Sequence, residues 1–132
     1  MTARKILDYA LDLINQRSED GEYTPYIADY EKNVLSYINI LTISLYELDC
    51  RLKGITCNID EVTPKSIESL DETPILHEAI CKSALVYGLA FMLLLEEEPE
   101  RAERFHALYK EECMKLEKMS TVCRRRPITE VY

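Results

Sequence analysis

Apolar residues recur every three or four positions along most of this chain of 132 residues. That spacing is typical of one face of an α-helix. It predicts a first amphipathic helix over residues 3 to 17, with Thr2 as its N-cap. A second, longer helix is predicted from Tyr26 to Lys53, where the period persists for about seven turns. Gly54 follows it, at the place where a left-handed C-cap belongs.

The stretch from Ser83 to Leu95 has no charged residue and is apolar on every side of a helix. A helix of this kind must be buried all round, either by other helices of the same chain or by other subunits. We expect this third helix to begin at Thr73 and Pro74 and to end near Glu97. Gly88, in its middle, predicts a close helix crossing, because glycine is otherwise unfavourable there.

A fourth helix is predicted from Pro99 to about Met119, and its apolar stripe consists of Ala102, Phe105, Leu108, Tyr109, Cys113 and Leu116. Residues 55 to 73 carry no sustained period and predict a long loop, with room for a short strand or a helical turn near residues 65 to 70. Residues 120 to 132 fit no amphipathic helix. They indicate either a frayed terminus or an extended arm that becomes ordered on a partner, for example by strand addition.

The resulting expectation is an all-α fold. It is a small four-helix bundle with a long loop between helices 2 and 3 and an extended C-terminal tail. The helical domain would cover residues 1–119 and the tail residues 120–132.

The net charge of −8 disfavours nucleic acid as a partner, because an acidic chain repels nucleic-acid phosphates. The one concentration of positive charge is Arg124–Arg126. Solubility is the simplest role for the acidity. No segment reaches the roughly 20 apolar residues needed to cross a bilayer, and the first residues do not resemble a signal peptide. Five scattered cysteines without a C-x-x-C pair indicate reduced thiols that fill the core, in a protein of the cytosol or one assembled there.

Catalytic and metal-binding signatures are missing from the sequence. It contains no P-loop, no G-x-G-x-x-G, no H-E-x-x-H and no nucleophile elbow. Glu103 and His106 form half of a di-iron motif, and the second half is lacking. Glu47 and Asp49 are expected on the largely polar flank of the second helix. We therefore predict that the protein is not an enzyme and has no catalytic residue, cofactor or metal.

Four sequence motifs occur in order along the chain. They are L-D-x-A-L-D-L-I at residues 7–14, A-D-Y and E-L-x-x-R-L-K-G at the ends of the second helix, S-L-D-E-T-P-I-L with L-V-Y-G-L-A-F-M-L-L within residues 69–94, and E-E-P-E-R-A-E-R-F-H-A-L-Y at residues 97–109. Over residues 5 to 119 this order resembles the small head–tail connector, or adaptor, proteins of tailed bacteriophages and prophages. In that family, a Y-G-L-A helix, an acidic turn with proline and an A-x-x-F-x-x-x-Y helix form the second half.

The resemblance implies a structural virion protein at the head–tail interface, assembled in the cytoplasm of the bacterial host. Its subunits would form a ring, commonly twelve-fold, beneath the portal protein. The ring would extend the DNA channel and dock a tail-proximal stopper or tail-completion protein. DNA would pass through without specific binding, and no membrane would be involved.

We predict partner-binding residues in the C-terminal tail and in the long loop: Arg124, Arg125, Arg126, Ile128, Val131, Tyr132, Ile59, Val62 and Ile67. Two alternatives remain open. One is a helical adaptor or regulator unrelated to phage assembly, which would bury its third helix within its own bundle. The other is a nucleic-acid-binding module that uses the arginine cluster, and its binding would depend steeply on salt.

Overall fold

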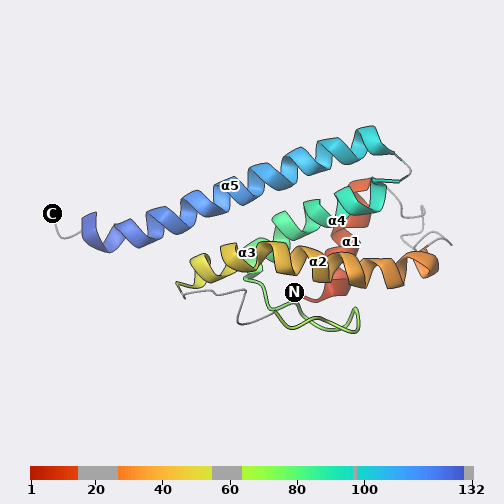
Figure 1. Ribbon diagram of the computed structural model, residues 1–132, viewed down its shortest axis with the longest axis horizontal. Helices are drawn as coiled ribbons and strands as arrows, with labels where there is room; N and C mark the ends of the chain where they lie inside the picture. The colour runs from red at the N-terminus through yellow and green to blue at the C-terminus, as the bar shows by residue number, and fades with distance from the viewer. Residues whose placement is uncertain (15–26, 55–63, 97, 130–132) are drawn as a thin grey trace.

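The described part of the chain is built from helices, with no strand in it (Figure 1). A computed structural model describes residues 1–14, 27–54, 64–96 and 98–129, with side chains in these ranges except at 27–32 and 120–129. The helices are α1 (Ala3–Ile14), α2 (Ile27–Lys53), α3 (Glu78–Lys82), α4 (Ala84–Leu94) and α5 (Pro99–Thr129). The predicted all-α class is confirmed, although the described ranges contain five helices rather than four.

The additional helix arises because the predicted third helix starts later and is interrupted at Ser83. The backbone of Ser83 leaves the helical region, with φ −127° and ψ −79°. Its hydroxyl donates to the carbonyl of Ala79 at 2.7 Å. A serine that bonds back to the carbonyl four residues earlier often bends a helix. The start lies at Glu78, where the Nδ1 atom of His77 accepts from the backbone N–H of Ala79 at 3.0 Å and caps α3.

The prediction of an extended tail from Ser120 is also wrong over most of its length. The backbone of α5 continues through Met119 and stays helical to Thr129. No glycine or proline occurs between Pro99 and Pro127, and arginine is among the better helix formers. Basic residues near a C-terminus also interact favourably with the helix dipole. Residues 130–132 lie outside the described part.

Helix α4 is the centre of the hydrophobic core. It packs against all four other helices, and its buried residues are Ala84, Leu85, Val86, Gly88, Leu89, Ala90 and Leu94. The chain therefore covers its most apolar helix with its own elements. Of the two ways to bury it, this is the one that requires no other subunit.

Gly88 lies where α4 is closest to α2 and α5, which confirms the predicted close crossing. A Cβ atom built at Gly88 would lie 2.9 Å from Leu41 Cδ2 and 3.1 Å from Tyr109 Cδ2. Gly54 also behaves as predicted, because its φ of 71° ends α2 in the left-handed region that favours glycine.

The described part of the long loop is held against α1. The first N–H groups of a helix lack partners within it. Here the N–H of Ala3 donates to the carbonyl of Glu72 at 3.0 Å, and that of Arg4 donates to the carbonyl of Leu70 at 2.9 Å. The hydroxyl of Thr2 accepts from the N–H of Lys5 at 3.3 Å, so the predicted N-cap is confirmed.

Helix α2 holds the same loop from the other side with polar side chains. Asn39 Nδ2 donates to the carbonyl of Ile67 at 3.1 Å, and the N–H of Ile67 donates to Asn39 Oδ1 at 2.9 Å. A turn follows in which the carboxylate of Glu72 accepts from the N–H groups of Glu68 and Ser69, which lowers the pKa of Glu72. The loop from Pro64 to His77 is therefore an ordered part of the fold.

Helix α5 extends well past the ends of α2 and α3 (Figure 1). Among the residues of α5 whose side chains are described, contacts with the bundle extend to Leu116, which is 5% exposed, and to Glu117, which pairs with Arg51 close to the end of α2. The backbone from Lys118 to Thr129 adds about 18 Å at 1.5 Å per residue. We call these twelve residues the overhang.

Candidate partner-binding surface

The partner-binding residues predicted from the sequence are not brought together in the described part of the chain. Arg124, Arg125, Arg126 and Ile128 belong to the overhang, and their side chains lie outside the described residues, as do Val131, Tyr132, Ile59 and Val62 altogether. Ile67 is described, and it lies in the hydrophobic core with 8% of its surface exposed. Because Asn39 also holds its backbone, Ile67 has a structural role in this subunit.

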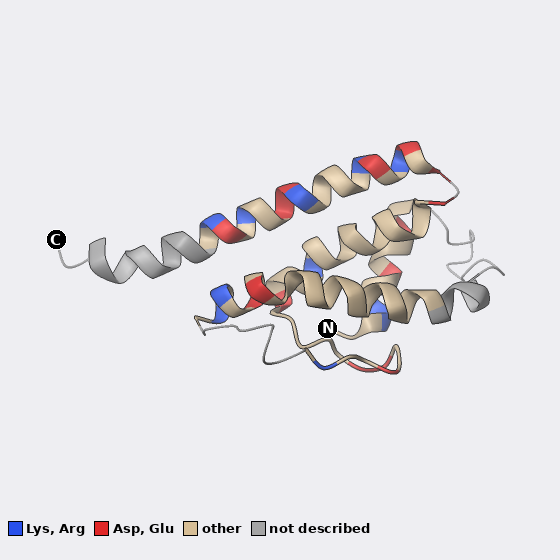
Figure 2. Ribbon diagram, viewed as in Figure 1, with Lys and Arg blue, Asp and Glu red and all other residues tan. Residues whose placement is uncertain are grey.

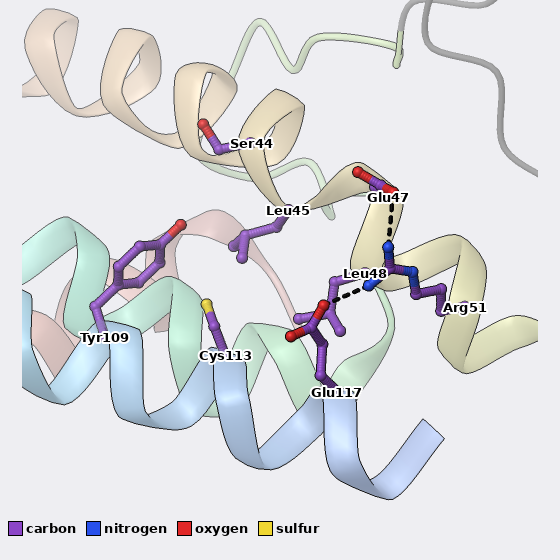
Figure 3. Close-up of a pocket in the computed structure, with 8 residues that line it drawn as sticks. All are labelled: Ser44, Leu45, Glu47, Leu48, Arg51, Tyr109, Cys113 and Glu117. Carbon is purple, nitrogen blue, oxygen red and sulfur yellow. Dashed lines mark hydrogen bonds and ion pairs between the residues drawn. The ribbon is translucent and has the colours of Figure 1, made fainter. Parts of the chain in front are cut away.

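A different surface emerges where α2 and α5 run past each other. A cavity of about 220 Å³ lies between them and is lined by Ser44, Leu45, Glu47, Leu48, Arg51, Tyr109, Cys113 and Glu117 (Figure 3). Leu45 and Leu48 are buried core residues of α2 and contribute apolar surface. The polar groups at one end belong to Glu47, Arg51 and Glu117. We call this surface the seam.

Arg51 is the central charge of the seam. Its Nη2 atom lies 2.8 Å from Glu47 Oε1, one helical turn earlier on α2, and its Nη1 atom pairs with Glu117 of α5 (Figure 3). The guanidinium can reach both carboxylates because its N–H groups form a planar fork. The three side chains together carry two carboxylates and one guanidinium. All three side chains are at least 40% exposed, and a partner can therefore reach them.

Tyr109 and Cys113 provide neutral polar groups on the α5 side of the seam. Burial, with a further contribution from Cys113, raises the pKa of Tyr109 to about 12. Burial also raises the pKa of the Cys113 thiol, and nearby Glu117 and Glu112 add to that rise. Both groups therefore stay protonated at neutral pH. The thiol is not activated as a nucleophile, since the thiolate is the reactive form.

The surface of α2 next to the seam is apolar. Ile40 and Ile43 are 51% and 43% exposed, and each lies one helical turn before a residue that lines the cavity, Ser44 or Glu47. An apolar patch beside a charged rim is the arrangement found at many protein–protein interfaces. On α5, basic and acidic residues are interspersed along the described surface (Figure 2).

The half-motif of Glu103 and His106 has a structural explanation. The imidazole of His106 stacks on the ring of Phe91 in α4, with centroids 4.6 Å apart and an interplanar angle of 24°. His106 thus helps to join α4 and α5. Within the described residues, no group of three or more His, Cys, Asp or Glu side chains could hold a metal ion.

Comparisons with known proteins add no family to this picture. No protein-family model, curated protein or solved structure matched the chain. Among its described helices, none is both long and apolar enough to span a membrane.

Sequence reasoning identified only part of the seam. The spacing of four residues between Glu47 and Arg51 is visible in the sequence and indicates an ion pair on one helix face. Tyr109 and Cys113 were predicted as part of the apolar stripe of the fourth helix, but they line the cavity. Glu117 could not be paired with Arg51 in advance, because that pair depends on how α5 crosses α2.

Proposed function

We propose that this chain is a structural subunit of a tailed-bacteriophage virion, a head–tail connector that forms a ring beneath the portal protein. In this role the ring extends the DNA channel and docks the next tail-proximal protein. The proposal begins from the order of helical motifs in the sequence. The observation that carries it furthest is the overhang of α5, because a helical backbone that continues for twelve residues past Glu117, beyond the ends of α2 and α3 (Figure 1), has the form of a docking arm.

The overhang also differs chemically from the rest of the subunit. It contains Lys118 and the three arginines Arg124–Arg126 and no acidic residue, in a chain whose net charge is −8. Helices in proteins gain most of their stability from packing on other surfaces. Binding to a partner with an acidic or polar surface would stabilise the overhang and would give the association electrostatic specificity.

The burial of α4 within the subunit removes one reason for a ring. An all-round apolar helix does not require a ring here, since α1, α2, α3 and α5 already cover it. Ring formation must therefore be driven by surface contacts. The acidic balance is compatible with a channel through which DNA slides, because it disfavours tight binding to phosphate.

The same burial favours a second candidate, a helical interaction adaptor unrelated to phage assembly. Such an adaptor would fold completely as a monomer and would use the overhang or the seam for another protein. It would add no ring to a portal. The two candidates therefore differ in whether the protein adds a ring to the portal.

The direct test is to mix the protein with its cognate portal protein and to image the product by electron microscopy. We expect an added ring with the full chain and none with a chain that ends at Met119. Circular dichroism should show that the truncated chain loses only the deleted turns of α5 and keeps its melting temperature. A truncated chain that still adds the ring, or a full chain that adds none, would contradict the proposal.

A further inference from the structure

The seam has the properties of a surface for a basic segment. Glu47 and Glu117 both pair with Arg51 beside a cavity of about 220 Å³, and their carboxylate side chains stay 62% and 54% exposed. The remaining lining includes the hydroxyls of Ser44 and Tyr109. The exposed side chains of Ile40 and Ile43 continue this surface along α2 and offer apolar contact area.

The sequence contains one segment with the complementary chemistry. The overhang carries Lys118 and Arg124–Arg126, together with the apolar residues Met119 and Val122, and no acid. Elsewhere in the chain, basic residues are outnumbered by acidic ones. A segment that combines guanidinium groups with apolar residues matches a seam that combines carboxylates with exposed isoleucines.

The backbone of Arg124–Arg126 lies beyond the seam of its own subunit. Arg124–Arg126 follow Glu117 by seven to nine residues on one continuous helix, which places their backbone about 10 to 14 Å farther along the axis. Helix α5 carries them away from the cavity, and no break in the helix allows a return. A second copy of the chain can approach without this restriction.

We propose that the overhang of one copy docks on the α2–α5 seam of the next. This inference rests on the proposed self-association and deepens it by naming the two surfaces that meet. An arginine of the arriving overhang shares the carboxylates of Glu47 and Glu117 with Arg51, and the apolar residues of the overhang cover Ile40 and Ile43. Because the two surfaces differ, the contact is heterologous and repeats from copy to copy, giving a closed ring or an open filament.

The test exchanges the charges of the two surfaces in the full-length protein. One variant carries Glu47→Lys and Glu117→Lys, and the other carries Arg124→Glu, Arg125→Glu and Arg126→Glu. Sedimentation equilibrium at low salt should show self-association of the wild type that weakens when salt is added. Each variant alone should associate about tenfold or more weakly than the wild type, because like charges then meet at the contact.

Mixing the two variants provides the decisive measurement. Each seam then finds an overhang of opposite charge, so association should return in the mixture. A matched control carries Glu100→Lys and Glu103→Lys, which make the same charge change at exposed positions of α5 about 20 Å or more from Glu117 by helix rise, and it should associate like the wild type. Circular dichroism of every variant checks that the helices are intact.

Two results would overturn the inference. One is a wild type that stays monomeric at every concentration at low salt, and the other is a mixture that associates no better than its components. Neither depends on the portal experiment. A chain that adds a ring to the portal but fails the charge exchange keeps the proposed function and loses this contact, whereas restored association without a portal ring does the opposite.

Discussion

Asp49 and His77 join the C-terminal half of α2 to the start of α3. The almost fully buried carboxylate of Asp49 accepts a hydrogen bond from the backbone N–H of His77, with 2.6 Å between nitrogen and Oδ1. Its other oxygen lies 2.9 Å from Lys53 Nζ, and that ammonium also donates to the carbonyl of Ile75 at 2.8 Å. Asp49 and Lys53 together hold the end of the loop on the bundle.

Replacing Asp49 with alanine should destabilise the protein by about 2 to 3 kcal/mol. The change leaves the N–H of His77 without its acceptor, and it removes the ion pair of Lys53, whose side chain is 38% exposed and keeps its bond to the carbonyl of Ile75. Denaturation with urea, followed by circular dichroism, measures the change in the free energy of unfolding. Asp71→Ala is a suitable control, because it removes an exposed ion pair with Arg4 and should cost less than about 1 kcal/mol.

Asn39→Ala should loosen the middle of the same loop. The amide of Asn39 makes both a donor and an acceptor bond with the backbone of Ile67, so its removal leaves two polar backbone groups unpaired. We expect a loss of about 2 kcal/mol in the free energy of unfolding and faster hydrogen exchange at the N–H of Ile67. Exchange at Ile67 that matches the wild type would show that the loop does not depend on this side chain.

The positions of the helices were largely predictable, because apolar spacing reports which face of a helix is buried. The burial of Asp49 was not predictable, and its expected place on a polar flank is wrong. A carboxylate can be buried there only because the N–H of His77 and the ammonium of Lys53 meet it. Those partners become apparent only when the loop packs on α2.

The backbone of α3 to α5 also contains features that could not be predicted from the sequence. The break at Ser83 depends on one side-chain hydrogen bond to Ala79, and a serine within an apolar run is compatible with either a bend or a straight helix. In the C-terminal segment, the lack of an apolar stripe predicts that no helix forms. Helix propensity continues through the arginines even where no packing face follows. The seam could not be predicted for a related reason, since it exists only where α2 and α5 cross.

Alkaline pH should destabilise the fold through Cys81 and Tyr109. Burial, the largest of several causes, raises the pKa of Cys81 from its ordinary value of 9.0 to about 11, and burial chiefly raises the pKa of Tyr109 from 10.0 to about 12. The unfolded chain therefore loses these protons at lower pH than the folded one. The stability they contribute is fully present below about pH 9 and is lost as the pH rises through about 11 to 12.

Urea denaturation across this pH range tests the assignment to these two groups. Cys81→Ala and Tyr109→Phe should each make the decline in the free energy of unfolding shallower, because each removes one of the shifted protons. Tyr9→Phe changes a tyrosine that is 48% exposed and should leave the slope as in the wild type. An unchanged slope in both buried-site variants would assign the alkaline loss to other groups.

Gly88 allows α2, α4 and α5 to meet closely, and its substitutions should reveal how much room the crossing has. Alanine at this position gains about 1 kcal/mol of helix propensity, but its Cβ would lie 2.9 Å from Leu41 Cδ2 and close to the ring of Tyr109. Leu41 is buried, whereas the ring of Tyr109 borders the cavity of the seam and can shift into it. We therefore expect Gly88→Ala to stay within about 1 kcal/mol of the wild type, because overpacking offsets the gain.

Gly88→Val places two further carbon atoms at the same crossing and should cost more than about 2 kcal/mol, since the adjoining cavity can relieve only part of the overlap. Urea denaturation measures both variants. If the ring of Tyr109 is what yields, Gly88→Ala should also change the near-ultraviolet circular dichroism of the tyrosines. A valine variant as stable as the wild type would mean that α5 is free to move away from α4, and that the seam is not held at a fixed width.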